Sequence, residues 1–592
     1  MAFMETVFRR RTAEDLGRID QTPTGKPARA AGKVEAGGSK LYRWSFVIHK
    51  WAGLIGAVWL ALLGLTGFLL NHDDWRWEQQ GKAPAFLTPA DLEEFSARNV
   101  TRYHQIDPAD ANRRVAGGPR GLWFSTDAAK SWKPTRFEDG DHPQINVILP
   151  QGEAGWDRLW FGTDNGAYLS TDGGESARPV GLQGEHVTAI AQGASAAELY
   201  VVVERSHLYR YRASDFSLIE EVKLAPVDVK TRPPEVEMLR FVHDLHLGKS
   251  FFGPAMSLTM NDIGGLGMFI LSLTGLLYWG LPKYWKHKAQ KAKASNAPLK
   301  SPAEKEARRA TKKATIVWLF RMHSATIGIA SVVMLLYLSV TGILLGHGRE
   351  LLGLMRMVKV PQTYLTPAFG MTSWDGWIDS VVAYPGAGGV FTIGTRIGMF
   401  TTADGGETFA REDDAKGAPV RSASRLRRIG ERVFNPNGMA GASTIRADSE
   451  PTERLAAPDQ SMDAMMARMM EAFKKRAAGA PDANMPATPG KKPGMGGMEG
   501  MFMPTDVTQS GDRLFWKSGA KLFATDMEGR SLETVEVNQP EDPGATWFHW
   551  LLRLHMGTIF WSEFKWINDV FAILAMFLTF TGLIRWWRKK WA

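Results

Sequence analysis

Residues 49–72 read HKWAGLIGAVWLALLGLTGFLLNH, and residues 323–347 read HSATIGIASVVMLLYLSVTGILLGH. Each stretch is apolar, has a histidine at both ends, and carries a Thr-Gly pair whose threonine stands six residues before the second histidine. About 20 apolar residues suffice for a helix to cross the hydrocarbon core of a bilayer. We therefore expect both stretches to be transmembrane helices with a histidine near each membrane face.

Two further apolar stretches share a second pattern, which starts with LHLG at His246 and with LHMG at His555. In both, an Asn-Asp pair follows and then a Thr-Gly pair, with 13 residues from the asparagine to the threonine. The asparagine and threonine positions are Asn261 with Thr274 and Asn568 with Thr581. The chain is thus predicted to be a duplicated two-helix unit with four transmembrane helices.

Charge predicts the orientation of these helices. Residues 282–313 hold eleven Lys and Arg against two acids, and the segments before the first and after the last apolar stretch are also basic. Basic residues favour the cytoplasmic side. Both termini and this loop are therefore expected inside, and residues 73–240 and 348–546 outside. The net charge of +9 reflects this topology and does not indicate nucleic-acid binding, because the charges flank the apolar stretches.

These patterns divide the chain into eight segments. They are a cytoplasmic basic arm (1–44), a first span (45–72), a first outer β-segment (73–240), a second span with a preceding histidine-bearing interfacial helix (241–284), a basic cytoplasmic loop (285–316), a third span (317–347), a second outer β-segment (348–546), and a fourth span with a preceding histidine-bearing helix and basic end (547–592).

The outer segments repeat short alternating strands separated by Gly-rich turns. STDGGES (170–176) and TADGGET (402–408) are similar to Asp-box turns, in which a carboxylate accepts backbone N–H groups and glycines supply positive φ. Leu159-Trp160 and Leu199-Tyr200 stand 40 residues apart, a period typical of propeller blades. We expect one all-β, propeller-like domain built from both halves of the chain, with a β-sandwich as the alternative. No catalytic residues are assigned, because no carboxylate pair stands out.

The histidines at the ends of the apolar stretches predict that the protein binds haem. The chain has no cysteine, which excludes iron–sulfur clusters, disulfides and covalent CxxCH haem. Histidines at membrane-helix ends are costly, and haem iron commonly accounts for pairs of them. One histidine set at each face predicts two b-type haems per chain, with glycines such as Gly53, Gly56 and Gly328 leaving room for the ring.

The duplication limits the pairing of these histidines. His49 and His323 form the cytoplasmic pair. The outer pair is either His246 with His555 or His72 with His347, and a mixed pair such as His72 with His246 remains open. Asp262 and Asp569 are expected either to orient an imidazole or to cap a helix.

A Met-rich insertion, residues 462–503, contains ten of the 26 methionines. Thioethers bind Cu(I), so a copper site is one interpretation, and a flexible Pro/Gly-rich insertion is the other. The copper candidates are Met465, Met466, Met469, Met470, Met495 and Met498.

The four apolar stretches, with LHLG…TGLLYW and LHMG…TGLIRWW, resemble the PepSY-associated transmembrane family, which includes bacterial ferrisiderophore-type membrane reductases. The resemblance covers about a quarter of the chain. It implies haem b in the bacterial inner membrane, electron transfer toward the periplasm, and His49, His246, His323 and His555 as ligands, while His72 fits an LLNH variant. The outer segments depart from the family, because no PepSY module is visible in them.

These observations predict a membrane-bound di-haem b-type oxidoreductase that passes electrons to a periplasmic acceptor, a ferric siderophore or other metal chelate. No dinucleotide fingerprint follows a strand, so the electron donor is expected to be separate, either quinol or a cytoplasmic flavoprotein. The alternatives are a periplasmic copper reductase that uses the Met-rich loop, and a membrane-anchored receptor or assembly factor without enzymatic activity.

Overall fold

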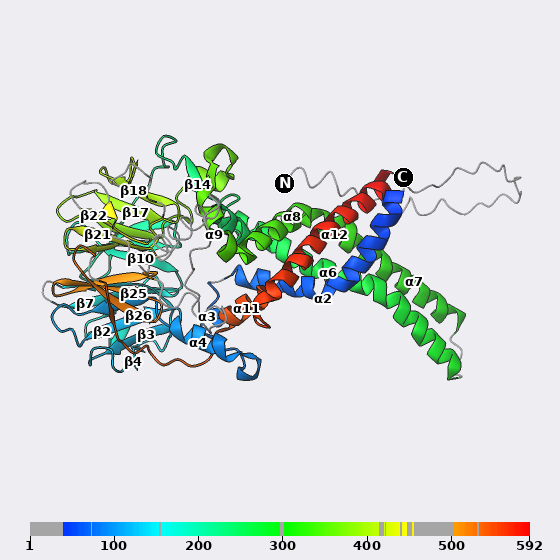
Figure 1. Ribbon diagram of the computed structural model, residues 1–592, viewed down its shortest axis with the longest axis horizontal. Helices are drawn as coiled ribbons and strands as arrows, with labels where there is room; N and C mark the ends of the chain where they lie inside the picture. The colour runs from blue at the N-terminus through cyan, green and yellow to red at the C-terminus, as the bar shows by residue number, and fades with distance from the viewer. Residues whose placement is uncertain are drawn as a thin grey trace, which may run out of the picture.

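The structure is a computed structural model that describes residues 40–72, 74–152, 155–295, 301–413, 420, 422–437, 441–446, 453–454, 502–529 and 532–591. It has two parts that follow one another along the long axis of the molecule, a β-domain and a helical bundle (Figure 1). The C-terminal helix ends at the tip of the bundle that points away from the β-domain. The two ends of the bundle are called the β-domain end and the free end below.

Four helices have the length and composition to cross a membrane. They are α2 (Lys40–Leu70), α6 (Pro254–Ala294), α8 (Ile327–Gly346) with the preceding α7 (Pro302–Phe320), and α12 (Lys565–Trp591). Helix α2 packs on α6 and α12, and α8 packs on the same two helices. The two helices of each sequence repeat therefore lie next to each other and next to the helices of the other repeat. The prediction of four long apolar helices is confirmed.

The basic segment predicted as a loop at 285–316 is largely helical. Helix α6 continues to Ala294 and α7 begins at Pro302. Ser301 and Glu304 form a capping box that fixes the start of α7, and Ala, Lys and Glu favour helix in both segments. The Lys312 ammonium lies 5.3 Å from the centre of the Trp285 ring, which joins the two extensions. The extensions project from the free end of the bundle (Figure 1).

The described strands form six main sheets and a two-stranded one. The main sheets are β1–β4 (Tyr103–Ile106, Arg114–Gly118, Gly121–Ser125, Lys133–Pro134); β5–β9 (Arg136–Phe137, Ile145–Gln151, Arg158–Thr163, Gly166–Ser170, Ser176–Gly181); β10–β13 (Val187–Gln192, Glu198–Val203, His207–Arg212, Leu218–Glu221); β16–β19 (Ser380–Ala383, Phe391–Thr395, Gly398–Thr402, Ala410–Arg411); β20–β23 (Arg427–Ile429, Arg432–Asn437, Gly441–Arg446, Glu453–Arg454); and β24–β27 (Asp506–Ser510, Arg513–Ser518, Lys521–Asp526, Glu533–Val535). The two-stranded sheet pairs β14 (Glu235–Glu237) with β15 (Lys359–Pro361).

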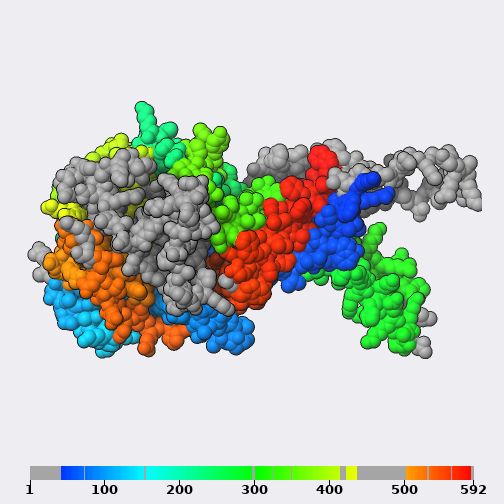
Figure 2. Space-filling model, viewed as in Figure 1, coloured from blue at the N-terminus to red at the C-terminus, as the bar shows by residue number. Residues whose placement is uncertain are grey.

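Successive sheets pack through separate hydrophobic clusters. One cluster joins the first two sheets, for example through Val115 and Phe161, and others join each later sheet to the next. Strand β1 contacts β24, so the first and last sheets also meet. Figure 2 shows the corresponding blue and orange surfaces in contact in the β-domain. The prediction that both outer segments contribute β-sheets to this part is therefore confirmed.

A buried carboxylate and the arginine that it binds link four of the sheets. Asp506 on β24 accepts hydrogen bonds from the backbone N–H of His104 at 3.0 Å and from Gln105 Nε2 at 2.6 Å, both on β1. It also accepts from Arg427 Nε on β20 at 2.9 Å, and Arg427 Nη1 donates to the carbonyl of Ile148 on β6. Segments that are about 400 residues apart in the chain are thereby held together.

The two Asp-box turns have the expected hydrogen bonds. The Asp172 carboxylate accepts the backbone N–H of Ser176 at 3.0 Å, and Asp404 accepts that of Thr408 at 2.9 Å. A third turn of this kind occurs at Ser125–Ser131, where the Asp127 carboxylate accepts from the backbone N–H of Ser131 at 2.9 Å. In this turn Ala128 and Ala129 occupy the positions of positive φ that glycines occupy in the other two. The turn was not predicted because the motif lacks these glycines.

Two short helices connect the β-domain to the bundle: α5 (Met238–His246) and α11 (Trp547–His555). Asp244 on α5 is buried and pairs with Arg396 Nε, from the β17–β18 turn, at 2.9 Å. Burial raises the pKa of Asp244, but Arg396, His243 and Arg240 outweigh this and hold the pKa below its usual range. The α5 helix is therefore fixed to the β-domain by a charged pair.

Candidate cofactor site: two facing histidine pairs

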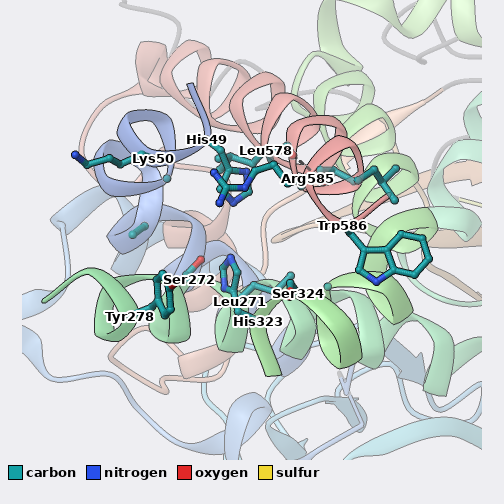
Figure 3. Close-up of a pocket in the computed structure, with 18 of the residues that line it drawn as sticks. His49, Lys50, Leu271, Ser272, Tyr278, His323, Ser324, Leu578, Arg585 and Trp586 are labelled. Atoms are coloured by element: carbon teal, nitrogen blue, oxygen red, sulfur yellow. Dashed lines mark hydrogen bonds between the residues drawn. The ribbon is translucent and has the colours of Figure 1, made fainter. Parts of the chain in front are cut away.

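The structure brings His49 of α2 and His323 together at the free end of the bundle. Their ring centres lie 6.0 Å apart with an angle of 83° between the ring planes. Both line a cavity of about 1030 Å³ whose walls are mainly apolar, and Arg585 and Trp586 of α12 also line it. Figure 3 shows both rings directed into the space between the helices. The cavity is as large as sites that hold sizeable cofactors, which reach about 1,000 Å³.

His323 lies on a π-helical turn, Arg321–Thr326, between α7 and α8. Such turns are rare within α-helices and are frequent at functional sites, because they redirect one side chain. Gly328 permits the turn, because a Cβ at this position would lie 2.4 Å from the carbonyl oxygen of His323. Gly328 and Gly53 line the cavity, as expected, whereas a Cβ on Gly56 would lie 2.8 Å from the Leu574 side chain. Gly56 therefore serves helix packing.

His246 and His555 form the second pair, at the β-domain end. Their ring centres lie 6.2 Å apart with an interplanar angle of 54°. Burial, together with the neighbouring His555 and His243, lowers the pKa of His246 to about 3, and burial lowers that of His555 to about 4. Both imidazoles are therefore neutral at pH 7, the form in which histidine binds a metal.

Each of the four paired histidines has its Nδ1 atom hydrogen-bonded to the threonine of a Thr-Gly pair. The pairs are His49 with Thr581 at 2.9 Å, His323 with Thr274 at 3.0 Å, His246 with Thr341 at 3.0 Å, and His555 with Thr66 at 2.9 Å. In every case the threonine belongs to a different helix from the histidine. The four Thr-Gly pairs were visible in the sequence, but no role was predicted for them.

The threonine hydroxyls determine which histidine nitrogen carries the proton. Each hydroxyl donates its single proton to the carbonyl four residues earlier in its helix. The acceptors are Leu62 for Thr66, Ile270 for Thr274, Tyr337 for Thr341 and Phe577 for Thr581, at 2.7–2.8 Å. A hydroxyl that has donated its proton can only accept from the imidazole. Nδ1 therefore carries the hydrogen, and Nε2 keeps a free lone pair.

The glycine of each Thr-Gly pair lies against the edge of the same imidazole. A Cβ on Gly67 would stand 3.2 Å from Cε1 of His555, and one on Gly275 would stand 3.2 Å from Cε1 of His323. Gly342 and Gly582 have the same relation to His246 and His49. The absence of a side chain lets the ring sit directly against the helix, so that the hydroxyl of the preceding threonine can reach Nδ1.

The asparagines of the two Asn-Asp pairs support the β-domain-end histidines. The Asn261 amide donates to the carbonyl of His246 at 2.6 Å, and the Asn568 amide donates to that of His555 at 2.8 Å. These carbonyls lie at helix ends, where they lack a partner within the helix. The chain then turns at a glycine with positive φ, Gly557 in the second repeat, where φ is +77°.

His72 and His347 are placed differently. His72 Nε2 lies 3.4 Å from the Asp262 carboxylate and its ring stacks on Trp75. His347 Nε2 lies 2.6 Å from Asp569. Asp262 and Asp569 thus contact these two histidines and neither facing pair. Of the alternatives left open for the outer pair, the structure brings together His246 and His555.

Each facing pair would offer two imidazole nitrogens to a haem iron. In the described part of the chain, no group of three or more His, Cys, Asp or Glu side chains is arranged to hold a metal. Two opposed imidazoles each bind a first-row metal at about 2 Å, which places the ring centres about 6 Å apart, as in both pairs. A haem would supply the remaining ligands of its iron. The methionines proposed for copper, Met465 to Met498, lie outside the described residues.

The family model of the PepSY-associated TM region matches the chain twice, over residues 23–281 and 229–589. The chain belongs to this family. No curated protein matches it. Among solved structures, the crystal structure of an ancestral GH74 enzyme is similar over 76% of this chain and 34% of its own, with 9% identity and a TM-score of 0.24. The chain thus spans about a third of the length of that enzyme, and a likeness at this level carries no argument.

Proposed function

We propose that the protein is a membrane-bound di-haem b-type oxidoreductase that carries electrons between the two faces of the bacterial inner membrane. The observation that carries the proposal is the presence of two facing imidazole pairs with free Nε2 atoms at opposite ends of one bundle. In this proposal His49 and His323 hold one haem, and His246 and His555 hold the other. Haem supplies reversible one-electron chemistry when bound, and the protein supplies orientation and electrostatics.

The cavity around His49 and His323 matches an amphipathic cofactor. Its walls are mainly apolar, while Lys50 and Arg585 stand among the lining residues. An arginine within a membrane helix is costly unless it has a partner. We propose that Arg585 pairs with the carboxylates at the edge of the haem. The Arg585 guanidinium lies 4.7 Å from the centre of the Phe46 ring, and both residues line the cavity.

The two pairs are separated by most of the membrane thickness. His49 and Thr66, which bonds the other pair, are 17 residues apart on α2, about 26 Å at 1.5 Å per residue. The hydrocarbon core is about 30 Å thick. The basic extensions of α6 and α7 are proposed to face the cytoplasm and the β-domain to face the periplasm.

We propose that the acceptor is a ferric siderophore or other metal chelate that docks on the β-domain, and that a quinol or a cytoplasmic flavoprotein is the donor. The β-domain is joined to the β-domain-end pair through the Asp244–Arg396 pair on α5, which keeps a docked acceptor close to it.

We further propose that the six main sheets are the blades of a propeller, supported by the contact between β1 and β24.

The test uses the full chain purified in detergent after haem-replete expression. A Soret band and a pyridine haemochrome assay giving about two haems per chain support the proposal. Stopped-flow mixing of the dithionite-reduced protein with ferric siderophores or Cu(II) is then expected to reoxidise it with saturable kinetics. Less than about half a haem per chain refutes the proposal and leaves a membrane-anchored receptor as the better interpretation.

A further inference from the structure

We infer that the threonines of the four Thr-Gly pairs are positioning residues that fix the Nδ1–H tautomer of the facing histidines and set the redox potential of the centre each histidine serves. The inference rests on the proposed haem sites, and it concerns residues that do not touch the metal. It is carried by four equivalent hydrogen bonds of 2.9–3.0 Å.

The hydroxyl geometry is fixed by the helices. A threonine whose hydroxyl bonds the carbonyl four residues earlier is held in one rotamer. Its oxygen then presents a lone pair to the imidazole, as with Thr66, which donates to Leu62 at 2.8 Å and accepts from His555 at 2.9 Å. Because all four threonines are buried, water does not replace this acceptor. In each of the four histidines, Nε2 is therefore the unprotonated ring nitrogen.

The hydrogen bond also tunes the imidazole. An imidazole that donates its Nδ1–H to an acceptor is a stronger base at Nε2. A more basic axial ligand stabilises ferric iron relative to ferrous iron and thus lowers the potential. A neutral hydroxyl is a weaker acceptor than a carboxylate. When one threonine hydroxyl is lost, Nε2 of the histidine that it bonded becomes a weaker base. The potential of that single centre is therefore expected to rise.

Each threonine bonds a histidine of one centre, whereas the paired histidine on its own helix, or just before that helix in the chain, belongs to the other centre. Helix α2 carries His49 of the free-end pair, but its Thr66 bonds His555 of the β-domain-end pair. Helix α12 carries Thr581, which bonds His49 of the free-end pair, whereas the short helix α11 just before it carries His555 of the β-domain-end pair. A threonine substitution is therefore predicted to act on the centre whose ligand it touches and not on the centre whose ligand shares its helix.

The experiment measures the midpoint potentials of both centres in Thr66→Val and Thr581→Val, with Thr66→Ser and Thr581→Ser as conservative variants. Thr66→Val is expected to shift only the centre that is lost in His555→Ala, and Thr581→Val only the centre that is lost in His49→Ala. The serine variants are expected to restore the wild-type potentials. Ser331→Ala is the matched control, because Ser331 is buried in α8 and donates to Ile327 at 2.7 Å without contacting a histidine.

A second measurement does not depend on haem. Nitrogen-15 NMR of selectively labelled histidines in the apoprotein is expected to show the Nδ1–H tautomer for His555 in the wild type and its loss in Thr66→Val. If haem is bound but both potentials stay unchanged in the valine variants, the inference is wrong and the proposed function stands. If the wild type binds no haem, the proposed function fails, and the NMR measurement alone decides the inference: an unchanged tautomer in Thr66→Val overturns it.

Discussion

Nδ1 of His49 donates a hydrogen bond of 2.9 Å to Oγ1 of Thr581, although 532 residues separate them in the chain. The bond joins the first and last membrane helices, so the geometry of the free-end pair depends on both ends of the sequence. Thr274 holds His323 in the equivalent way. A site built like this forms only when all four helices have assembled.

The first prediction concerns the histidine pairs. His49→Ala or His323→Ala is expected to remove one haem per chain, and His246→Ala or His555→Ala to remove the other, because each variant leaves one imidazole where two are needed. Pyridine haemochrome content and redox titration measure the loss.

Three single variants serve as controls for this prediction: His72→Ala, His347→Ala and His287→Ala. The first two lie beside Asp262 and Asp569, and His287 lies on the exposed extension of α6. All three are expected to retain both haems. Loss of a haem in His72→Ala or His347→Ala, with retention in His246→Ala, would contradict the pairing.

The second prediction concerns Arg585. Arg585→Leu is expected to lower haem occupancy at the free-end centre, because the cofactor carboxylates lose their cationic partner within the membrane. Arg585→Lys keeps the charge and is expected to retain most of the occupancy. Haem titration of the apoprotein, with the centres distinguished by their potentials, measures the difference. Equal occupancy in the leucine variant and the wild type would rule out this role.

The third prediction concerns Gly328. Gly328→Ala is expected to abolish the free-end centre and to leave the other intact, because a Cβ would lie 2.4 Å from the His323 carbonyl oxygen and break the π-helical turn. Gly280→Ala on α6 is the control, since a Cβ there meets nothing within 4 Å. Visible spectra of both variants check the result, and a normal haem content in Gly328→Ala would show that the turn tolerates a side chain.

The fourth prediction concerns the ion pair between α5 and the β-domain. Arg396→Ala leaves the buried Asp244 carboxylate without its closest cation and is expected to cost about 3–5 kcal/mol in the free energy of unfolding. Arg212→Ala removes an exposed pair with Asp215 and is expected to leave the free energy of unfolding almost unchanged, because solvent screens exposed ion pairs. Denaturant unfolding followed by tryptophan fluorescence measures both. Similar losses in the two variants would argue against a special role for Arg396.

The fifth prediction concerns pH. Burial lowers the pKa of Lys517, on β25, from 10.5 to about 7. Between pH 7 and pH 10.5 the unfolded chain therefore binds more protons at this lysine than the folded chain does, so its contribution to stability rises with pH across that window. Lys517→Met removes this contribution.

The difference in unfolding free energy between the wild type and Lys517→Met is accordingly expected to shift in favour of the wild type as the pH rises from 7 to 10. Thermal unfolding across this range checks the slope. A difference that stays constant with pH would mean that Lys517 keeps its ordinary pKa in the folded protein.

The sequence alone was sufficient to predict the four membrane helices, their duplication and the candidate histidines. Spans of about 20 apolar residues are local features with one physical explanation, and the repeated LHLG and LHMG motifs located His246 and His555. The Asp-box turns at Asp172 and Asp404 were also readable, because the glycines that supply positive φ are part of the motif.

Only the tertiary structure decided which histidines face each other and what the threonines do. Spacing along the chain left His72 and His347 as candidates for the outer pair, because it does not reveal that each lies against an aspartate of another helix. The π-helical turn at His323 was likewise not predicted from the sequence. Above all, the bonds from His49 to Thr581 and from His555 to Thr66 join helices from opposite ends of the sequence, and such contacts exist only after the helices have packed.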